Sequence, residues 1–353
     1  MLAVLDRPDC RQFEFVAVAP SAGPLTEALD ARGIQRVSLQ LRDDDEKRLP
    51  RDVVCENLCD AIAAVSPQIV HANSLSMGRL TGAIAEELSI PTIAHLRDII
   101  KLSRAAIADL NRNRLLIAVS EATRGFHVAQ NLDAERTRAL YNGVDCDVFL
   151  PHAATGRLKR ELGLPDDAFL VVTIGQIGLR KGQDVLAEAA VRAAENAPNV
   201  HYLLVGVRNS SKQESIEFES NLLARFESAG LGDRLHRLGY RDDVAWIMNE
   251  ADLLVHPAHQ EPLGRVLLEA AASGLPIIAS NVGGTSEIVE NGISARLIPA
   301  NDPALLASAI LELRSDEVLR QRLTASARKR VESVFGIDAA ARALCRVWGA
   351  IGE

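Results

Sequence analysis

Two glutamates with a helix start between them are the residues of this sequence whose spacing most clearly suggests chemistry. Glu261 is followed by Pro-Leu-Gly, which cannot be helical because proline restricts the residue before it and glycine loosens the backbone. Residues 265–273 predict a short helix that contains Glu269 and ends at Gly274. The N–H groups and positive dipole end of such a helix favour a phosphate, and the carboxylates suit hydroxyl groups. A nucleotide sugar has this layout of hexose, diphosphate and ribose, although solvated surface charges are the usual fate of glutamate.

A glycine-rich turn with two cations is the second candidate for diphosphate binding. Gly175 follows a predicted strand, and Arg180, Lys181 and Gly182 precede a predicted helix. Such a turn can surround a diphosphate with N–H groups and positive charge. The alternative is an ordinary surface Arg-Lys pair near a helix start.

Three aromatic or imidazole side chains stand at the ends of predicted strands. His95 ends the run at residues 91–96, which is the edge of a parallel sheet where ligands bind. His71 ends another run, and there a structural role is the preferred interpretation. Tyr240 follows a third run and could stack on a base, although a half-buried tyrosine at a strand end explains it equally well.

The elements that would position these residues alternate regularly. Strands are predicted at residues 13–19, 37–39, 68–71, 91–96, 115–119, 138–141, 169–174, 201–205, 235–238, 253–255, 276–280 and 295–298. Amphipathic helical stretches separate most of them, which predicts parallel sheets covered by helices. The alternation of strands and helices starts again after Pro151, and this predicts two doubly wound α/β domains with a cleft between them.

Composition excludes several classes of protein. The net charge of −8 over 353 residues gives no electrostatic footprint for nucleic acid. No apolar run reaches the roughly 20 residues of a membrane span, and no secretory signal begins the chain. Five dispersed cysteines do not form a disulfide framework, so we expect buried reduced thiols and a cytoplasmic protein.

The segment at residues 261–290 resembles the signature of glycosyltransferase family 4, retaining enzymes of the GT-B fold. The resemblance implies that Glu261 contacts the donor hexose and Glu269 the ribose. Amides of the intervening loop would hold sugar and phosphate, at Leu263, Gly264, Arg265 and Val266. Lys181 matches a cation of the family that neutralises the diphosphate, and Arg180 can replace an arginine that is Gln176 here. His95 resembles the active-site histidine of the family, and Tyr240 lies in the segment that lines the base.

The resemblance also implies a domain division. We expect an N-terminal acceptor-side domain at residues 1–150, a nucleotide-sugar domain at 151–333, and a C-terminal helix at 334–353 that crosses back to the first domain. The start of the chain resembles only the end of the family's first helix. The family's first strand and its glycine-rich loop are therefore expected to be missing.

The function that these features predict is transfer of a hexose, with retention, from a nucleoside diphosphate sugar to an acceptor hydroxyl. The acceptor would be a glycan or lipid-linked molecule, and the basic stretch from Arg97 to Arg114 would allow peripheral contact with the inner face of a membrane. No metal site and no cofactor are expected. A nucleotide-sugar-binding or interaction protein without turnover is the alternative. A dehydrogenase fits less well, because no G-x-G-x-x-G follows a predicted strand.

Overall fold

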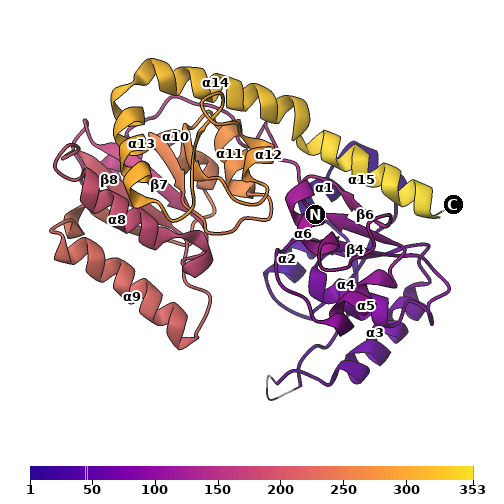
Figure 1. Ribbon diagram of the computed structural model, residues 1–353. Helices are drawn as coiled ribbons and strands as arrows, with labels where there is room; N and C mark the ends of the chain where they lie inside the picture. Colours follow the sequence, from indigo (N-terminus) through magenta and orange to yellow (C-terminus); the bar gives the residue numbers. More distant parts are fainter. Residues whose placement is uncertain (44, 46, 353) are drawn as a thin grey trace. The chain divides into compact units, whose positions relative to one another are not determined.

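Short apolar runs alternate with helices throughout the chain and build parallel sheets covered by helices (Figure 1). A computed structural model describes residues 1–43, 45 and 47–352. It divides into unit 1, Met1–Gly143 with Ile337–Glu353, and unit 2, Val144–Gly336. Each unit is described separately below.

Unit 2 contains one parallel sheet in the order β12-β11-β10-β7-β8-β9. Its strands are β7 (Phe169–Ile174), β8 (Val200–Val205), β9 (Leu235–Gly239), β10 (Leu253–His256), β11 (Ile277–Ser280) and β12 (Arg296–Ile298). The strand β7 pairs with both β8 and β10, so the chain order reverses there. In sheets of this type ligands bind outside the carboxyl ends of the strands, at the point of reversal.

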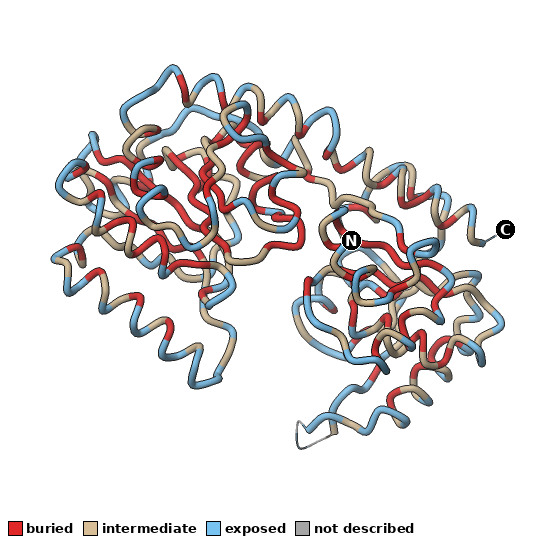
Figure 2. The backbone as a smooth tube through the Cα atoms, viewed as in Figure 1, coloured by how far each residue is buried: buried red, intermediate tan, exposed pale blue. Residues whose placement is uncertain are grey.

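Helices follow most strands of unit 2. They are α7 (Arg157–Glu161), η2 (Leu179–Lys181), α8 (Gln183–Ala193), α9 (Gln213–Ser228), η3 (Gly232–Arg234), α10 (Val244–Glu250), α11 (Arg265–Ala272), α12 (Thr285–Ile288), α13 (Pro303–Ser315) and α14 (Glu317–Val334). Val171 packs with α8, α9 and α13 in one apolar cluster. Its neighbours Leu170 and Val172 point to the other face and are equally buried, so both faces of the sheet are covered (Figure 2).

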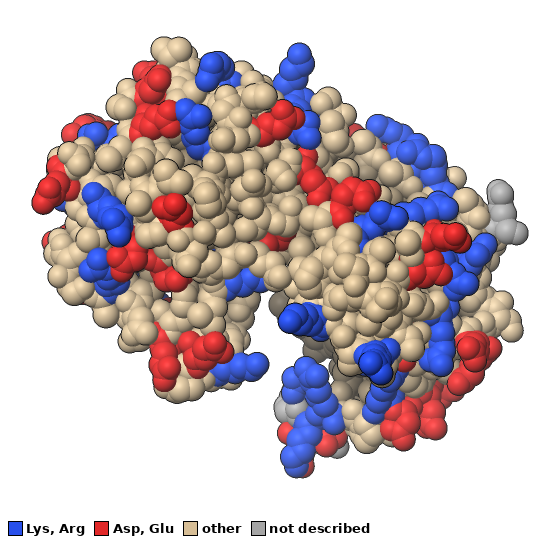
Figure 3. Space-filling view, in the orientation of Figure 1, with Lys and Arg blue, Asp and Glu red and all other residues tan. Residues whose placement is uncertain are grey.

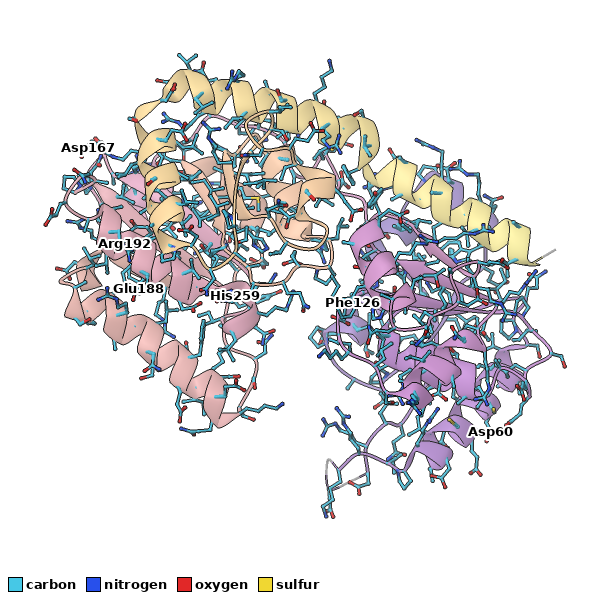
Figure 4. The ribbon with its side chains drawn as sticks, viewed as in Figure 1. Asp60, Phe126, Asp167, Glu188, Arg192 and His259 are labelled. Carbon is cyan, nitrogen blue, oxygen red and sulfur yellow. The ribbon has the colours of Figure 1, made fainter. Side chains whose placement is uncertain are left out.

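The surface of unit 2 carries mixed charges. Figure 3 shows acidic and basic side chains side by side over α8 and α9. Glu188 on α8, labelled in Figure 4, accepts hydrogen bonds from Arg225 on α9 at 2.5 and 2.9 Å. An exposed pair of this kind adds little stability.

Unit 1 contains two parallel sheets, β1-β2 and β3-β4-β5-β6. The strands are β1 (Val16–Ala19), β2 (Gln35–Ser38), β3 (Val70–Ala72), β4 (Thr92–Leu96), β5 (Leu115–Ala118) and β6 (Thr137–Ala139). Among the described residues, no strand pairs with the second edge of β1 or of β3. The described strands of unit 1 therefore form two separate sheets.

The helices of unit 1 include the C-terminal one. They are α1 (Leu2–Leu5), η1 (Pro8–Gln12), α2 (Pro24–Asp30), α3 (Arg51–Val65), α4 (Leu75–Ala83), α5 (Arg104–Asn111), α6 (Glu121–Val128) and α15 (Ile337–Gly352). Leu344, Cys345 and Trp348 of α15 share an apolar cluster with Ile93 and Ile117 of the sheet. The predicted strand at residues 13–19 starts only at Val16, because Phe13 and Phe15 pack edge-on against the Trp348 indole.

The chain passes from unit 1 to unit 2 at residues 143–144, earlier than the division expected at 150–151. Residues just after that point are bound to unit 2. Arg328 Nη1 donates to the carbonyl oxygen of Phe149 at 2.7 Å, and Asn249 Nδ2 donates to that of Leu150 at 3.1 Å. These contacts attach the segment to unit 2, and sequence alone does not reveal them.

All five cysteines are free, as expected, but only Cys10 and Cys345 are buried. Their sulfur atoms lie 3.0 Å apart. Burial, first of all, raises the pKa of the Cys10 thiol to about 12. The remaining three cysteines are half-buried, contrary to the expectation.

Candidate active site

Two loops meet at the carboxyl ends of β7 and β10 in unit 2. The first runs from Gly175 through Arg180 and Lys181 to α8, and the second runs from His256 to α11. His259 of the second loop, labelled in Figure 4, donates its backbone N–H to the carbonyl oxygen of Arg180 at 2.9 Å. At Gly182 a side chain would lie 2.0 Å from the carbonyl oxygen of Pro257, so only glycine allows this approach.

Glu261 lies at the centre of these loops. Its Oε2 accepts hydrogen bonds from Lys181 Nζ at 2.6 Å and from His256 Nε2 at 2.9 Å, while Arg180 Nη1 lies 3.7 Å from its Oε1. Its side chain is only 8% exposed. Burial alone would raise the pKa of Glu261, but His256 and Lys181 outweigh burial and lower it to about 2. The carboxylate is therefore ionised at neutral pH and acts only as an acceptor.

His256 belongs to this cluster and was not singled out from the sequence. It ends β10 and is fully buried. Burial lowers its pKa despite the neighbouring carboxylate, so the ring is neutral and its Nε2–H donates to Glu261. The only available signal was its place at the end of a buried strand, five positions before Glu261.

The loop after Glu261 turns into α11 as predicted. Gly264 adopts a φ of 99°, a conformation that favours glycine. Leu263 and Val266 are buried, whereas the Arg265 side chain is 74% exposed. The first N–H groups of α11 have no preceding helical turn to bond, so the helix start offers donors to an anion.

Glu269 lies on α11 and is largely buried. Its Oε1 accepts a hydrogen bond from Arg265 Nη2 at 3.0 Å. Burial raises the pKa of Glu269, and the neighbouring Arg265 only partly opposes this effect. The two glutamates therefore differ in electrostatic environment, because strong partners surround Glu261 and a single exposed arginine accompanies Glu269.

The other two predicted residues of unit 2, Gly175 and Tyr240, follow the ends of β7 and β9, which flank β8. The N–H of Gly175 donates to the carbonyl oxygen of Val205 at 2.9 Å, which aligns the ends of β7 and β8. Tyr240 follows β9 and is 79% exposed, so it is not the half-buried residue of the alternative interpretation.

His95 belongs to unit 1, where it lies on β4 and is 2% exposed. His71 Nε2 and Arg97 Nη2 each lie 3.3 Å from its Nδ1. Burial, followed by the charge of Arg97, lowers the pKa of His95 well below its usual value. Its Nε2 is buried and has no hydrogen-bond partner among the described residues.

Comparison with known proteins follows the division into two units. Residues 155–330 match the family model for glycosyl transferases group 1, and residues 10–148 match that for glycosyltransferase family 4. A D-inositol 3-phosphate glycosyltransferase of Geodermatophilus obscurus is 30% identical over 281 residues, which are 74% of this chain and 62% of the relative. Its counterpart in Xylanimonas cellulosilytica is 30% identical over 306 residues, 79% of this chain and 71% of the relative.

The chain belongs to glycosyltransferase family 4. It spans 62% of the length of the first of these relatives. Solved structures that resemble this chain confirm the GT-B fold. Anabaena HepE in complex with UDP-glucose superposes with a TM-score of 0.85 at 23% identity, over 99% of this chain and 95% of that one. Sucrose-phosphate synthase from Thermosynechococcus elongatus gives a TM-score of 0.76 at 22% identity, over 95% and 98%.

Metal-binding clusters and membrane-spanning helices are both absent from the part of the chain that the structure describes. In residues 1–43, 45 and 47–352, no group of three or more His, Cys, Asp or Glu side chains could hold a metal ion. The sequence does contain Asp145-Cys146-Asp147, but the Asp145 carboxylate accepts the N–H of Asp147 at 3.0 Å and so forms a local turn. Over the same residues, no helix is both long enough and apolar enough to span a bilayer.

Proposed function

We propose that this family 4 glycosyltransferase transfers a hexose from a nucleoside diphosphate sugar to an acceptor hydroxyl, with retention of configuration and without a metal ion. The Glu261 cluster is the observation that carries the proposal. The ionised, buried carboxylate of Glu261 accepts a hydrogen bond from the ammonium of Lys181. Glu261 lies in the loop that leads directly into the N-terminus of α11. The proposal therefore assigns hydroxyl binding and phosphate binding to groups that lie at one edge of the sheet.

The proposed roles in donor binding follow from this arrangement. Glu261 accepts hydrogen bonds from hydroxyl groups of the hexose. Lys181, Arg180 and the first N–H groups of α11 bind the diphosphate and stabilise the negative charge that develops as it leaves. Glu269 accepts hydrogen bonds from the ribose hydroxyls, and the exposed ring of Tyr240 stacks on the base.

The proposed chemistry is a front-side displacement. The acceptor hydroxyl approaches the anomeric carbon on the face from which the diphosphate departs, so the configuration is retained. Electrostatic stabilisation of the leaving diphosphate supplies the largest part of the rate enhancement. The proposed acceptor is a glycan or a lipid-linked molecule.

Uracil is the proposed base of the donor, because Anabaena HepE, which this chain resembles in fold, is a complex with UDP-glucose. A thermal-shift panel of UDP-, GDP- and ADP-glucose tests this on the full chain, since a ligand that binds only the folded state raises Tm. We expect UDP-glucose to give the largest rise. Uridine monophosphate is the matched control, and it should give a smaller rise because it lacks the second phosphate for Lys181. No rise with any nucleoside diphosphate sugar would contradict the proposal.

Binding without turnover is the competing function. The two-part sheet of unit 1 favours it, because β1 and β3 each have an edge that no described strand pairs. Donor hydrolysis by the same protein separates the two possibilities. Nucleotide release at a rate above that of buffer supports the enzyme, and a Tm rise with no release supports a binding protein.

A further inference from the structure

Three aromatic side chains of unit 1 form a hydrogen-bonded series across α15, β3 and β4. Trp348 Nε1 lies 2.9 Å from His71 Nδ1, and His71 Nε2 lies 3.3 Å from His95 Nδ1. Phe13 and Phe15 hold the indole edge-on, with ring centroids 5.4 and 5.5 Å away. The series therefore begins at a fixed side chain.

The direction of the hydrogen bonds follows from the first donor. An indole N–H can only donate, so His71 Nδ1 must accept. Burial, followed by the charge of Arg97, lowers the pKa of His71 to about 3, and the ring is neutral at physiological pH. A neutral imidazole has one N–H, which in His71 is then on Nε2 and donates to His95 Nδ1.

Arg97 imposes the same direction on His95. Its Nη2 lies 3.3 Å from His95 Nδ1 and can only donate. The guanidinium is held by the Asn73 side chain at 2.6 and 3.1 Å and by Asn142 Oδ1 at 3.0 Å. Since His95 Nδ1 faces two donors, the single proton of this neutral ring belongs on Nε2.

The last donor of the series, the Nε2–H of His95, has no acceptor among the described residues. His95 Nε2 is buried and has no partner among the described residues, although buried polar groups are nearly always paired. Such an orphaned donor in a side chain that is 2% exposed points to an oxygen acceptor that a ligand supplies.

We propose that Trp348 and His71 are positioning residues that fix His95 as a neutral Nε2–H donor toward an oxygen atom of the glycosyl-transfer substrate. The proposal rests on the proposed function, and it gives His71 a role that its sequence position does not indicate. His95 then stabilises substrate oxygen as a hydrogen-bond donor and does not act as a general base, because its Nδ1 is permanently occupied.

The tautomers are tested by long-range ¹H–¹⁵N NMR of the full chain labelled at histidine. In the wild type we expect both His71 and His95 as Nε2–H tautomers that do not titrate between pH 6 and 8. UDP-glucose should shift the His95 Nε2 resonance. An Nδ1–H tautomer of His95, titration in this range, or no shift at saturating UDP-glucose would overturn the proposal.

Variants of His71 separate positioning from packing. His71→Gln keeps an acceptor for Trp348 and a donor for His95, so it should retain kcat within about twofold and preserve the His95 tautomer. His71→Met and Trp348→Phe remove one hydrogen bond each and should lower kcat about tenfold with little change in KM. His236→Gln and Trp246→Phe, in unit 2, are the matched controls and should leave kcat unchanged. Equal kcat for His71→Gln and His71→Met in folded proteins would contradict the proposal.

These measurements distinguish failure of the hydrogen-bonded series from failure of the proposed function. The tautomers of the free protein can be measured without substrate, so tautomers other than those expected would overturn the proposal about the series even if transferase activity is present. A protein with the expected tautomers that neither binds nor hydrolyses any nucleotide sugar would overturn the proposed function and, with it, the role of His95 toward substrate.

Discussion

Glu261 is kept ionised by partners from two separate segments of the chain, and this has a consequence for stability. A pKa lowered from 4.5 to about 2 corresponds to about 3 kcal/mol at neutral pH. Because the folded pKa is the lower one, this stabilisation is present above pH 4.5 and is lost as the pH falls toward 2.

The stability difference between the wild type and Glu261→Gln should therefore be largest above about pH 5 and should shrink toward pH 2. Urea denaturation at a series of pH values measures it. Lys181→Met removes one of the partners and should weaken the pH dependence. A difference that stays constant down to pH 2 would show that the Glu261 carboxylate is not stabilised as described.

The two glutamates of the loop are expected to differ in what they bind. Glu269→Ala should weaken binding of the bare nucleoside diphosphate by about 1 to 3 kcal/mol, through lost hydrogen bonds from the ribose. Glu261→Ala should lower turnover more than nucleotide affinity, because its proposed partner is the hexose. Calorimetry and steady-state kinetics measure both, with Glu188→Ala on the exposed face of α8 as control. Equal loss of nucleotide affinity in the two loop variants would make the assignment wrong.

Sequence reasoning reached those residues whose signal is local. Pro262, Gly264 and Gly274 predict the loop and helix around Glu261. The predicted helix at residues 265–273 agrees with α11 to within one residue. His256 was not singled out and His71 was assigned a structural role, because a buried histidine at a strand end looks the same whether it is structural or functional. Their partners come from five to several hundred positions away, as the contact of His71 with Trp348 shows.

At the scale of elements, the two parts of the unit 1 sheet differ in pairing from the sheet of unit 2. Among the strands of the described residues, β1 pairs only with β2 and β3 only with β4, whereas β7 is paired along both edges. The carbonyl oxygen of Ala19 accepts a hydrogen bond from the β2 side, so the backbone amide of the preceding residue, Val18, points to the unpaired edge of β1. The N–H of Val70 donates a hydrogen bond toward the β4 side, so the backbone amide of the next residue, His71, points to the unpaired edge of β3.

Native hydrogen exchange should therefore show faster exchange at Val18 and His71 than at Val172 in β7. The neighbouring amides of Ala19 and Ala72 point to paired edges and are internal controls within the same strands. Exchange of Val18 and His71 as slow as that of Val172 would show that the open edges are protected in solution.

The strands were the most predictable elements. Each predicted apolar run coincides with a strand to within a few residues, and residues 169–174 match β7 at both ends. The errors occur where tertiary packing competes with the pattern. Residues 13–15 look like strand but are used as an aromatic support for Trp348, and no local pattern specifies a helix that arrives more than 300 positions later.

At the scale of the whole molecule, the chain enters unit 2 after Gly143 and leaves it before Ile337. These two crossings are adjacent, since Val144 N–H donates to the carbonyl oxygen of Phe335 at 2.8 Å. The helix α15 then completes the apolar cluster of unit 1 and supplies Trp348 to the histidine series. Residues 337–352 are therefore part of the unit that carries His95.

The stereochemistry of the first product tests the central claim most directly. UDP-glucose carries an α-linked glucose, and ¹H NMR can follow the anomer that the full chain releases to water before mutarotation mixes the two. Retention predicts that α-glucose appears first, and that Glu261→Ala abolishes its release. Initial release of β-glucose, or release that is unchanged in Glu261→Ala, would contradict the proposed function.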